Sequence, residues 1–109
     1  LIHDRRTDEN GDTKVIAVNA PLGLGFEIGW NTRYLPCFME WKSTASGDYV
    51  IGLEPANSSV YGRPWHEERN SVHRLEPFHT ETNVLTFTVL DGKDEISAAL
   101  EAFDRQFKP

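Results

Sequence analysis

The sequence GDYVIGLEPAN, residues 47–57, predicts a strand that ends in a carboxylate, and the rest of the chain is interpreted around it. Successive side chains of a strand point to opposite faces, so Gly52 and Glu54 share a face and leave a bare patch beside the carboxylate. Pro55 favours an extended backbone at Glu54 and supplies no ladder donor. We therefore expect Glu54 at a strand end that a ligand can approach closely, although many such carboxylates are only solvated edge charges.

The residues before this stretch predict its partner strand. Residues 35–42 carry apolar side chains at alternate positions, and the turn residues STASG separate them from the strand over residues 48–54. This arrangement predicts a hairpin. Pairing Lys42 with Asp48 gathers the apolar side chains of both strands on one face, whereas a slip of one residue would scramble both faces. The pattern therefore predicts this register.

In that register Phe38 lies opposite Gly52 and forms an aromatic plate near Glu54. Such a plate can stack on a sugar ring, or it can simply pack over the glycine. Glu40 and Glu54 then share a face but lie roughly 13 Å apart, at about 3.3 Å per residue. Because the paired carboxylates of glycosidases are about 5–9.5 Å apart, this spacing disfavours a glycoside hydrolase built on these two residues.

The remaining segments predict an all-β fold, mainly antiparallel, with one short C-terminal helix. Runs of β-branched or alternating apolar residues indicate further strands, and residues 93–107 change to helical spacing with acidic residues in the first turn. The expected strands are residues 14–19, 25–31, 72–77 and 83–90. Residues 1–13 are polar and contain an Asn-Gly turn signal, so we expect a loop or a frayed start there.

Composition limits the class of protein. A chain of 109 residues with a net charge of −6 is long enough for one modest domain and lacks the clustered basic side chains of a nucleic-acid surface. No run approaches the roughly 20 apolar residues of a membrane helix. Cys37 is the single cysteine, so no internal disulfide forms, and we expect a buried thiol in a cytoplasmic protein. The chain begins at Leu1 rather than at Met, so we expect a fragment or a processed product.

The polar loop over residues 57–70 carries the other candidate binding residues. Asn57, Arg63 and Trp65 are suited to contact sugars, and loops hold binding residues more often than cores do. The alternative is a surface loop with its tryptophan tucked beneath it. Four potential metal ligands also occur here: His66, Glu67, Glu68 and His73. Their spacing is not that of the H-E-x-x-H motif and no cysteine joins them, so we expect no metal and no other cofactor.

Several short motifs occur in an order that resembles a known family. They are Leu35-Pro36, Glu40-Trp41-Lys42, Asp48-Tyr49-Val50, and Gly52-Leu53-Glu54-Pro55 followed by Asn57. Together they resemble the C-terminal part of the aldose 1-epimerase (galactose mutarotase-like) superfamily, and especially an uncharacterised bacterial branch of it. One departure lies at residues 78–81, FHTE, where family members often have a Gly-Glu turn.

The resemblance implies that residues 1–109 are a single partial domain, the C-terminal portion of a larger two-sheet β-sandwich. It also implies an isomerase that interconverts sugar anomers, with Glu54 as the general base. The family's general acid is a histidine upstream of the matched segment, and no histidine of this chain lies in a motif that assigns it that role. The chain alone is therefore expected to be inactive. Its expected partners are a monosaccharide or sugar derivative, the missing N-terminal part of the same protein, and a second copy of the protein.

Two other classes of function fit the same residues. One is a non-catalytic sugar-binding β-sandwich module, in which Glu54, Asn57, Arg63 and Trp65 only hold hydroxyl groups. The other is a structural or assembly domain, in which Glu54 is solvated and inert. The motif order favours the epimerase-like function over both.

Overall fold

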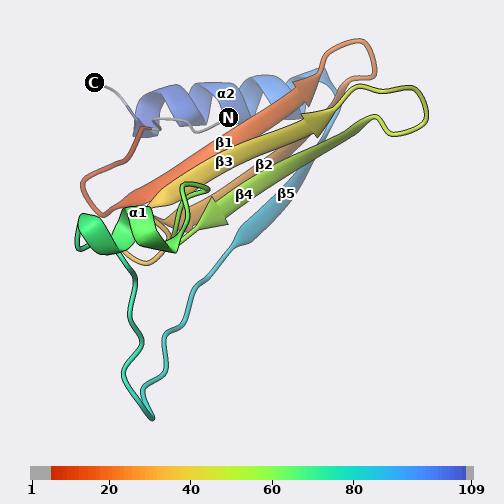
Figure 1. The fold of residues 1–109 in the computed structure, drawn as a ribbon. Coiled ribbons are helices and arrows are strands. Elements are labelled where there is room, and N and C mark those ends of the chain that lie inside the picture. The colour runs from red at the N-terminus through yellow and green to blue at the C-terminus, as the bar shows by residue number, and fades with distance from the viewer. Residues whose placement is uncertain (1–5, 108–109) are drawn as a thin grey trace. The chain divides into compact units, whose positions relative to one another are not determined.

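The computed structural model describes residues 6–107, which form two compact units. One unit is Arg33–Asn83, and the other combines residues 6–32 with residues 84–107. The prediction of mostly antiparallel strands is confirmed, but the described residues form two small sheets and contain two helices rather than one (Figure 1). Residues 1–5 of the expected N-terminal loop lie outside the described residues, and the first strand begins at Asp12.

The discontinuous unit contains a three-stranded antiparallel sheet in the order β1-β2-β5. Its strands are β1 (Asp12–Asn19), β2 (Leu24–Asn31) and β5 (Thr86–Asp91). Val15 pairs with Ile28, which pairs in turn with Phe87. A tight turn with Gly23 at φ +64° joins β1 to β2, a backbone conformation that glycine adopts without strain. The strands expected from the β-branched and alternating residues of β1 and β2 are thus confirmed, while β5 begins later than expected.

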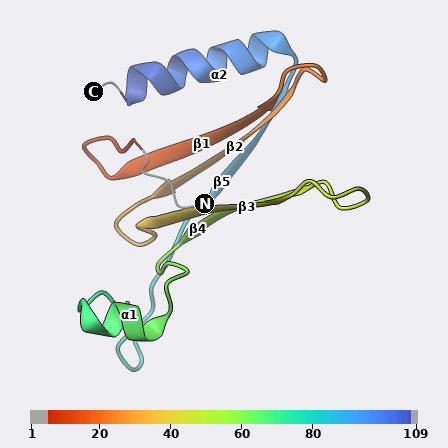
Figure 2. The same ribbon diagram turned by 45° about the horizontal axis from the view of Figure 1, so that its top comes forward.

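Helix α2 (Lys93–Gln106) confirms the predicted C-terminal helix and lies against one face of this sheet (Figure 2). Leu90 on β5 is buried, as are Ile96 and Phe107 near the two ends of the helix. The start of the helix is joined to the β1–β2 turn, because the N–H of Gly92 donates to the carbonyl of Gly23 over 2.7 Å. Apolar packing and a backbone hydrogen bond therefore both hold α2 on its unit.

On the other face of this sheet, Ile28 and Trp30 are buried, whereas apolar side chains of β5 are exposed. The ring centroids of Phe26 on β2 and Phe87 on β5 lie 5.8 Å apart in a stacked arrangement. Phe87 and Val89 are 60% and 68% exposed. Contiguous apolar surface of this kind is uncommon on a protein face that water covers, so the face is suited to contact with further protein.

The continuous unit is built on an antiparallel hairpin of β3 (Cys37–Ser43) and β4 (Val50–Ala56). The hairpin was predicted, but its predicted register is wrong: Lys42 pairs with Ile51 rather than with Asp48, a shift of three residues. The physical reason is the turn, which extends to Tyr49 in the left-handed region at φ +41° and thus removes Tyr49 from the strand. An odd shift moves one strand's side chains to the opposite face relative to its partner.

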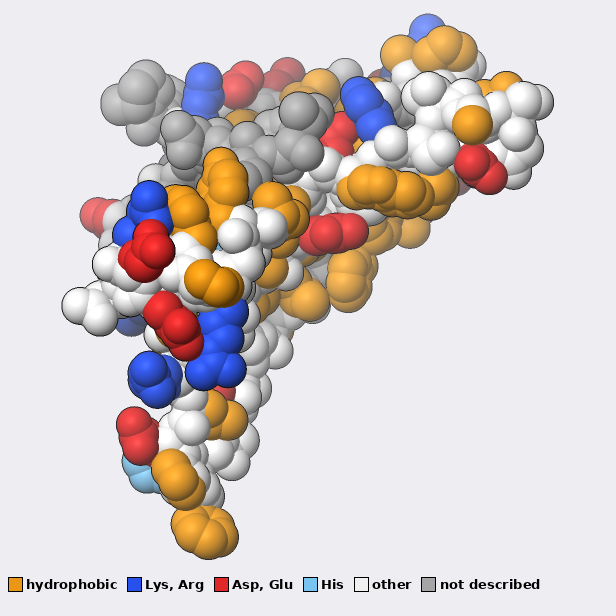
Figure 3. Space-filling view, viewed as in Figure 1, with side chains coloured by type: hydrophobic (Ala, Val, Ile, Leu, Met, Phe, Trp, Pro, Cys, Tyr) orange, Lys and Arg blue, Asp and Glu red, His pale blue; other side chains and the backbone are white. Residues whose placement is uncertain are grey.

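The segment after the hairpin also differs from expectation. A short helix, α1 (Arg63–Glu68), replaces part of the expected loop, with a proline in its first turn, a position that tolerates the missing N–H. The strand expected over residues 72–77 is absent, and this stretch is irregular. Hydrophobic side chains at the tip of this loop are exposed, including Leu75 at 59% and the fully exposed Phe78 (Figure 3). Neither helix of the described part of the chain is long and apolar enough to cross a membrane.

Candidate functional site

Glu54 lies on β4 opposite Met39, two residues before the last residue of the strand. The expected strand end at Pro55 is wrong, because Pro55 and Ala56 still pair with β3. Its side chain is exposed and folds back along the strand over Gly52. A Cβ atom at position 52 would lie 2.8 Å from Oε1 of Glu54, which is closer than real Cβ contacts allow. Gly52 therefore leaves space that the carboxylate itself occupies, and the glycine sets where the charge of Glu54 sits.

One face of the hairpin, which we call the Glu54 face, carries this carboxylate. It consists of Cys37, Met39, Trp41 and Ser43 on β3, and Val50, Gly52, Glu54 and Ala56 on β4. Trp41 pairs directly with Gly52, and its indole is 56% exposed. An open aromatic ring and an open carboxylate thus flank the same glycine. The predicted register gave this position to Phe38 and placed Trp41 among the apolar side chains of its strand, opposite Tyr49.

Phe38 and Glu40 lie on the opposite face of the hairpin. Phe38 pairs with Pro55 and is 3% exposed, so its predicted pairing with Gly52 is wrong. Glu40 pairs with Leu53 and lies 3.8 Å from Nζ of Lys42, and the earlier placement of Glu40 on the same face as Glu54 is wrong as well. Two carboxylates on opposite faces of one hairpin cannot flank a single glycosidic bond, which strengthens the case against a glycosidase pair.

A hollow of about 230 Å³ follows the end of β4. Its lining brings together Asn57 and Arg63, two of the predicted binding residues, with Ser59, His66 and His73. Arg63 is not a free cation, because its Nε donates to Oε1 of Glu67 over 2.7 Å. Neither Glu54, Phe38 nor Trp65 lines this hollow.

His66 joins the two ends of the segment around α1. Its ring is 6% exposed, and both ring nitrogens are engaged by serines. The backbone N–H of Ser59 donates to Nε2, which makes Nε2 an acceptor; Nδ1 then carries the proton and donates to Oγ of Ser71 over 2.7 Å. The hydroxyl of Ser59 lies 2.8 Å from Nε2 and accepts the N–H of Tyr61. A buried histidine whose two nitrogens are both hydrogen-bonded has a structural role: it holds the loop together and is not free to act as a general acid.

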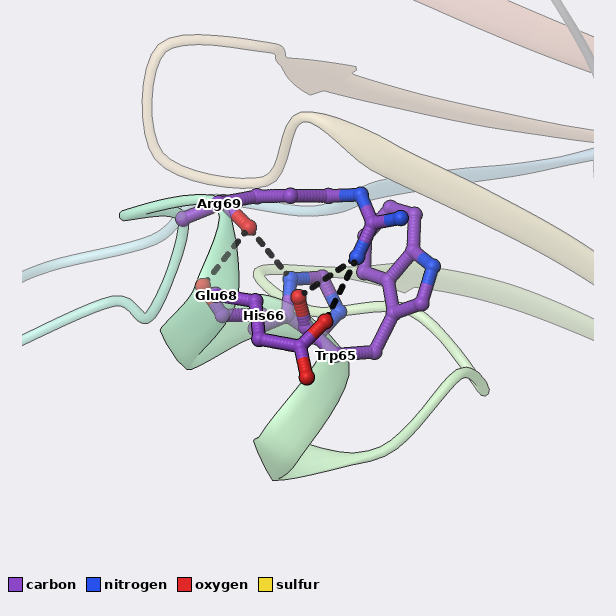
Figure 4. A network of polar contacts seen from close by, with 5 residues as sticks. Trp65, His66, Glu68 and Arg69 are labelled. Carbon is purple, nitrogen blue, oxygen red and sulfur yellow. Dashed lines mark hydrogen bonds and ion pairs between the residues drawn. The ribbon is translucent and has the colours of Figure 1, made fainter.

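Trp65 is part of a stacked arrangement on α1. Its ring lies 4.6 Å from that of Tyr61. The guanidinium of Arg69 lies over the indole, 4.0 Å from its centroid (Figure 4). Arg69 also donates to the carbonyl of Trp65 over 3.0 Å and approaches Glu68 at 3.7 Å. The indole of Trp65 is therefore covered by protein groups, while the ring of Tyr61 is 57% exposed.

The other titratable groups of this unit do not gather into a metal site. Nε2 of His73 lies 2.7 Å from Oε2 of Glu81, an exposed pair of two groups. Within residues 6–107, no group of three or more His, Cys, Asp or Glu side chains is arranged to hold a metal ion. Cys37 is half-buried rather than buried as expected.

The chain belongs to the family described as "Domain of unknown function (DUF4432)", whose pattern matches residues 1–89. It is also similar to a solved structure described as a "putative aldose 1-epimerase" from Klebsiella pneumoniae subsp. pneumoniae MGH 78578, with 29% sequence identity and a TM-score of 0.82. The predicted resemblance to aldose 1-epimerase-like proteins is thereby confirmed.

The similarity covers 93% of this chain but 27% of the Klebsiella protein, so the chain spans about a quarter of that protein's length. No curated protein matches the chain. The comparisons therefore support the family and the partial fold.

Sequence reasoning identified Glu54 and Asn57 but missed Trp41 and the serines that hold His66. The position of Trp41 opposite Gly52 follows only from the strand register, which depends on the length of the turn that ends at Tyr49. The sequence signal for the His66 contacts is limited to serines seven residues before and five residues after the histidine, and such spacing is common in polar loops. The proline in the first turn of α1 was a usable helix-start signal.

Proposed function

We propose that the protein carrying this chain is a carbohydrate-binding aldose 1-epimerase-like isomerase in which Glu54 is the general base. The observation that supports this most is the position of Glu54: an exposed carboxylate two residues before the last residue of β4, beside a glycine and an open indole. The likeness to the Klebsiella protein, described as a "putative aldose 1-epimerase", supports the reaction class.

The proposed mechanism follows from the chemistry of a cyclic hemiacetal. The carboxylate of Glu54 removes the proton of the anomeric hydroxyl, while an acid protonates the ring oxygen and the C1–O5 bond breaks. Rotation about the C1–C2 bond and reclosure then place the hydroxyl on the other face of the ring. Proton transfer by positioned side chains contributes about 10²–10⁴-fold to such reactions.

The general acid is proposed to come from a part of the protein outside this chain. His66 is buried with both nitrogens engaged, and His73 is paired with Glu81. We accordingly propose that residues 1–109 form one portion of a larger galactose mutarotase-like β-sandwich, a single domain completed by an N-terminal part. The exposed apolar face with Phe87 and Val89 supports a further protein contact there, with that part or with a second copy. A cytoplasmic location is proposed with this function.

The mechanism predicts that Glu54→Gln in the complete protein lowers kcat for anomerisation by about 10²–10⁴-fold, because the amide cannot accept the anomeric proton. Polarimetry of freshly dissolved α-D-glucose or α-D-galactose measures this rate. Glu68→Gln is the matched control, since Glu68 is 77% exposed on α1 and should leave the rate unchanged. An unchanged rate in the Glu54 variant would remove this residue from the mechanism.

A non-catalytic sugar-binding module is the second candidate, and the hollow lined by Asn57 and Arg63 is the observation that favours it. In that case the side chains would hold hydroxyl groups without moving a proton. Saturable binding of a monosaccharide with no acceleration of mutarotation by the complete protein would support the module over the isomerase. No binding of any sugar would leave a structural or assembly role for the chain.

A further inference from the structure

We infer that Trp41 is the platform on which a neutral pyranose ring stacks beside Glu54. The inference rests on the proposed function and assigns the substrate-holding residue of that site. It replaces Phe38, which the sequence alone had placed in this role.

The register places Trp41 beside the proposed base. Trp41 pairs with Gly52, and Met39 pairs with Glu54, so Trp41 and Glu54 are diagonal neighbours on the Glu54 face. Diagonal neighbours of an antiparallel pair lie about 7–8 Å apart, within reach of aromatic and long side chains. Gly52 contributes no side chain between them, so a ligand resting on the indole meets the carboxylate without an obstruction from β4.

The indole of Trp41 is free to receive a ligand. It is 56% exposed, and within residues 6–107 it has no stacked ring and no cation over it. Trp65 differs, because Tyr61 and Arg69 already cover its indole. A tryptophan face attracts C–H groups that carry a partial positive charge, and the axial C–H groups of a pyranose present such a surface. Of these two tryptophans, Trp41 is therefore the one available to a sugar.

The charge of the face indicates the class of sugar. Among its eight strand residues, all within the described part of the chain, the single ionisable group with a formal charge is the carboxylate of Glu54. Lys42, the nearest cation on the same strand, lies on the opposite face with Glu40. A phosphate placed on the Glu54 face would face a negative charge and find no partner there. The face therefore suits a neutral aldopyranose rather than a sugar phosphate.

The test is a titration of the complete protein with D-glucose and D-galactose, followed by the indole N–H signals in ¹H–¹⁵N NMR. The Trp41 signal, assigned by its absence in Trp41→Phe, should shift saturably, whereas the Trp65 signal should stay in place. Trp41→Ala should weaken binding about tenfold, as expected for loss of one stacking ring, and Trp41→Phe should weaken it less than threefold, or about 0.7 kcal/mol. Phe78→Ala removes a fully exposed aromatic ring elsewhere in this unit and should change nothing.

The kinetic pattern separates this inference from the proposed function. Trp41→Ala should raise KM with little change in kcat, because the ring holds substrate and transition state equally, while Glu54→Gln should lower kcat. If sugars bind and are anomerised but Trp41→Ala leaves affinity unchanged, the platform is overturned and the function survives. Tighter binding of glucose 6-phosphate than of glucose would overturn the choice of a neutral sugar. Absence of both binding and catalysis would overturn the function and the platform together.

Discussion

Gly52 controls where a charge sits. A Cβ atom at this position would meet Oε1 of Glu54 at 2.8 Å, and that oxygen is the far end of a flexible, exposed side chain. The carboxylate is therefore able to move away at little cost to stability, but it would leave the position from which we propose that it acts as a base. A glycine that appears to be a plain strand position is thus part of the geometry of the site.

Gly52→Ala is accordingly expected to lower kcat about 10- to 100-fold, because small misplacements of a catalytic group are costly. The same change should leave the urea midpoint of unfolding nearly unaltered, since φ at Gly52 is not in the left-handed region. Polarimetry and urea unfolding monitored by circular dichroism measure the two quantities on the complete protein. Full activity in this variant would mean that the observed carboxylate position is irrelevant to catalysis.

We expect His66 to stabilise the fold rather than to take part in catalysis. Removing its ring leaves the partly buried N–H of Ser59 without this acceptor, takes away the partner of the Ser71 hydroxyl at Nδ1, and empties a buried site. We expect His66→Ala to lower the free energy of unfolding by about 1–3 kcal/mol, the cost of unsatisfied buried polar groups. Urea unfolding gives this value, and His79→Ala, at an exposed position, is the control. If His66→Ala lowered the free energy of unfolding no more than His79→Ala does, this structural role of His66 would be contradicted.

At the scale of elements, the turn between β3 and β4 decides which face each side chain occupies. The sequence pattern placed Tyr49 in a strand, but its left-handed backbone makes it a turn residue and lengthens the loop. A tyrosine at positive φ is uncommon, so neither propensity nor alternation favours it. The turn length could not be predicted from the local sequence. As a result Phe38 was predicted to be the aromatic partner of Gly52, whereas the partner in the structure is Trp41.

Helix α2 is hydrogen-bonded to the segment before β1 through the carboxylate of Asp8. Nε2 of Gln106 donates to Oδ2 of Asp8 over 3.0 Å, and the backbone N–H groups of Asn10 and Asp12 donate to Oδ1. The hydrogen bond from Gln106, followed by those from the backbone, lowers the pKa of Asp8 below its ordinary value of 3.8. The charged carboxylate accepts these hydrogen bonds best, so the contact between α2 and this segment depends on ionised Asp8.

A lowered pKa in the folded state means that Asp8 stabilises the fold above its ordinary pKa and that this stabilisation is lost as the pH falls through the folded-state value. The difference in Tm between the wild type and Asp8→Ala should therefore be present at pH 6 and shrink as the pH approaches 3. Gln106→Ala should reduce this pH dependence, because it removes the largest cause of the shift. A difference that stays constant with pH would show that ionisation of Asp8 is not what holds the helix.

At the scale of the whole chain, the sequence predicted the elements whose side chains repeat regularly. The alternation in β2 and the helical spacing of Ile96, Leu100 and Phe103 in α2 carry their own periodicity, so local pattern was enough. The irregular stretch over residues 72–77 was predicted to be a short strand, but no partner strand pairs with it among the described residues. Pairing is a long-range property, and local pattern does not contain it.

The same limit applied to the candidate site. Glu54 and Asn57 were found because a motif carries them in consecutive positions. Trp41 was missed because its nearness to Glu54 arises across two strands. His66 was considered as a metal ligand and as the general acid, but its serine partners lie on the two sides of a helix that was predicted as a loop.

The separation of β2 from β5 along the chain has a consequence for biosynthesis. More than fifty residues lie between Asn31, the last residue of β2, and Thr86, the first of β5. At about 5–20 residues per second, the ribosome delivers β5 about 3–11 s after β2. During that interval the nascent β1–β2 hairpin displays an unpaired edge and the apolar ring of Phe26, the conditions under which chaperones bind and neighbouring chains on a polysome coaggregate.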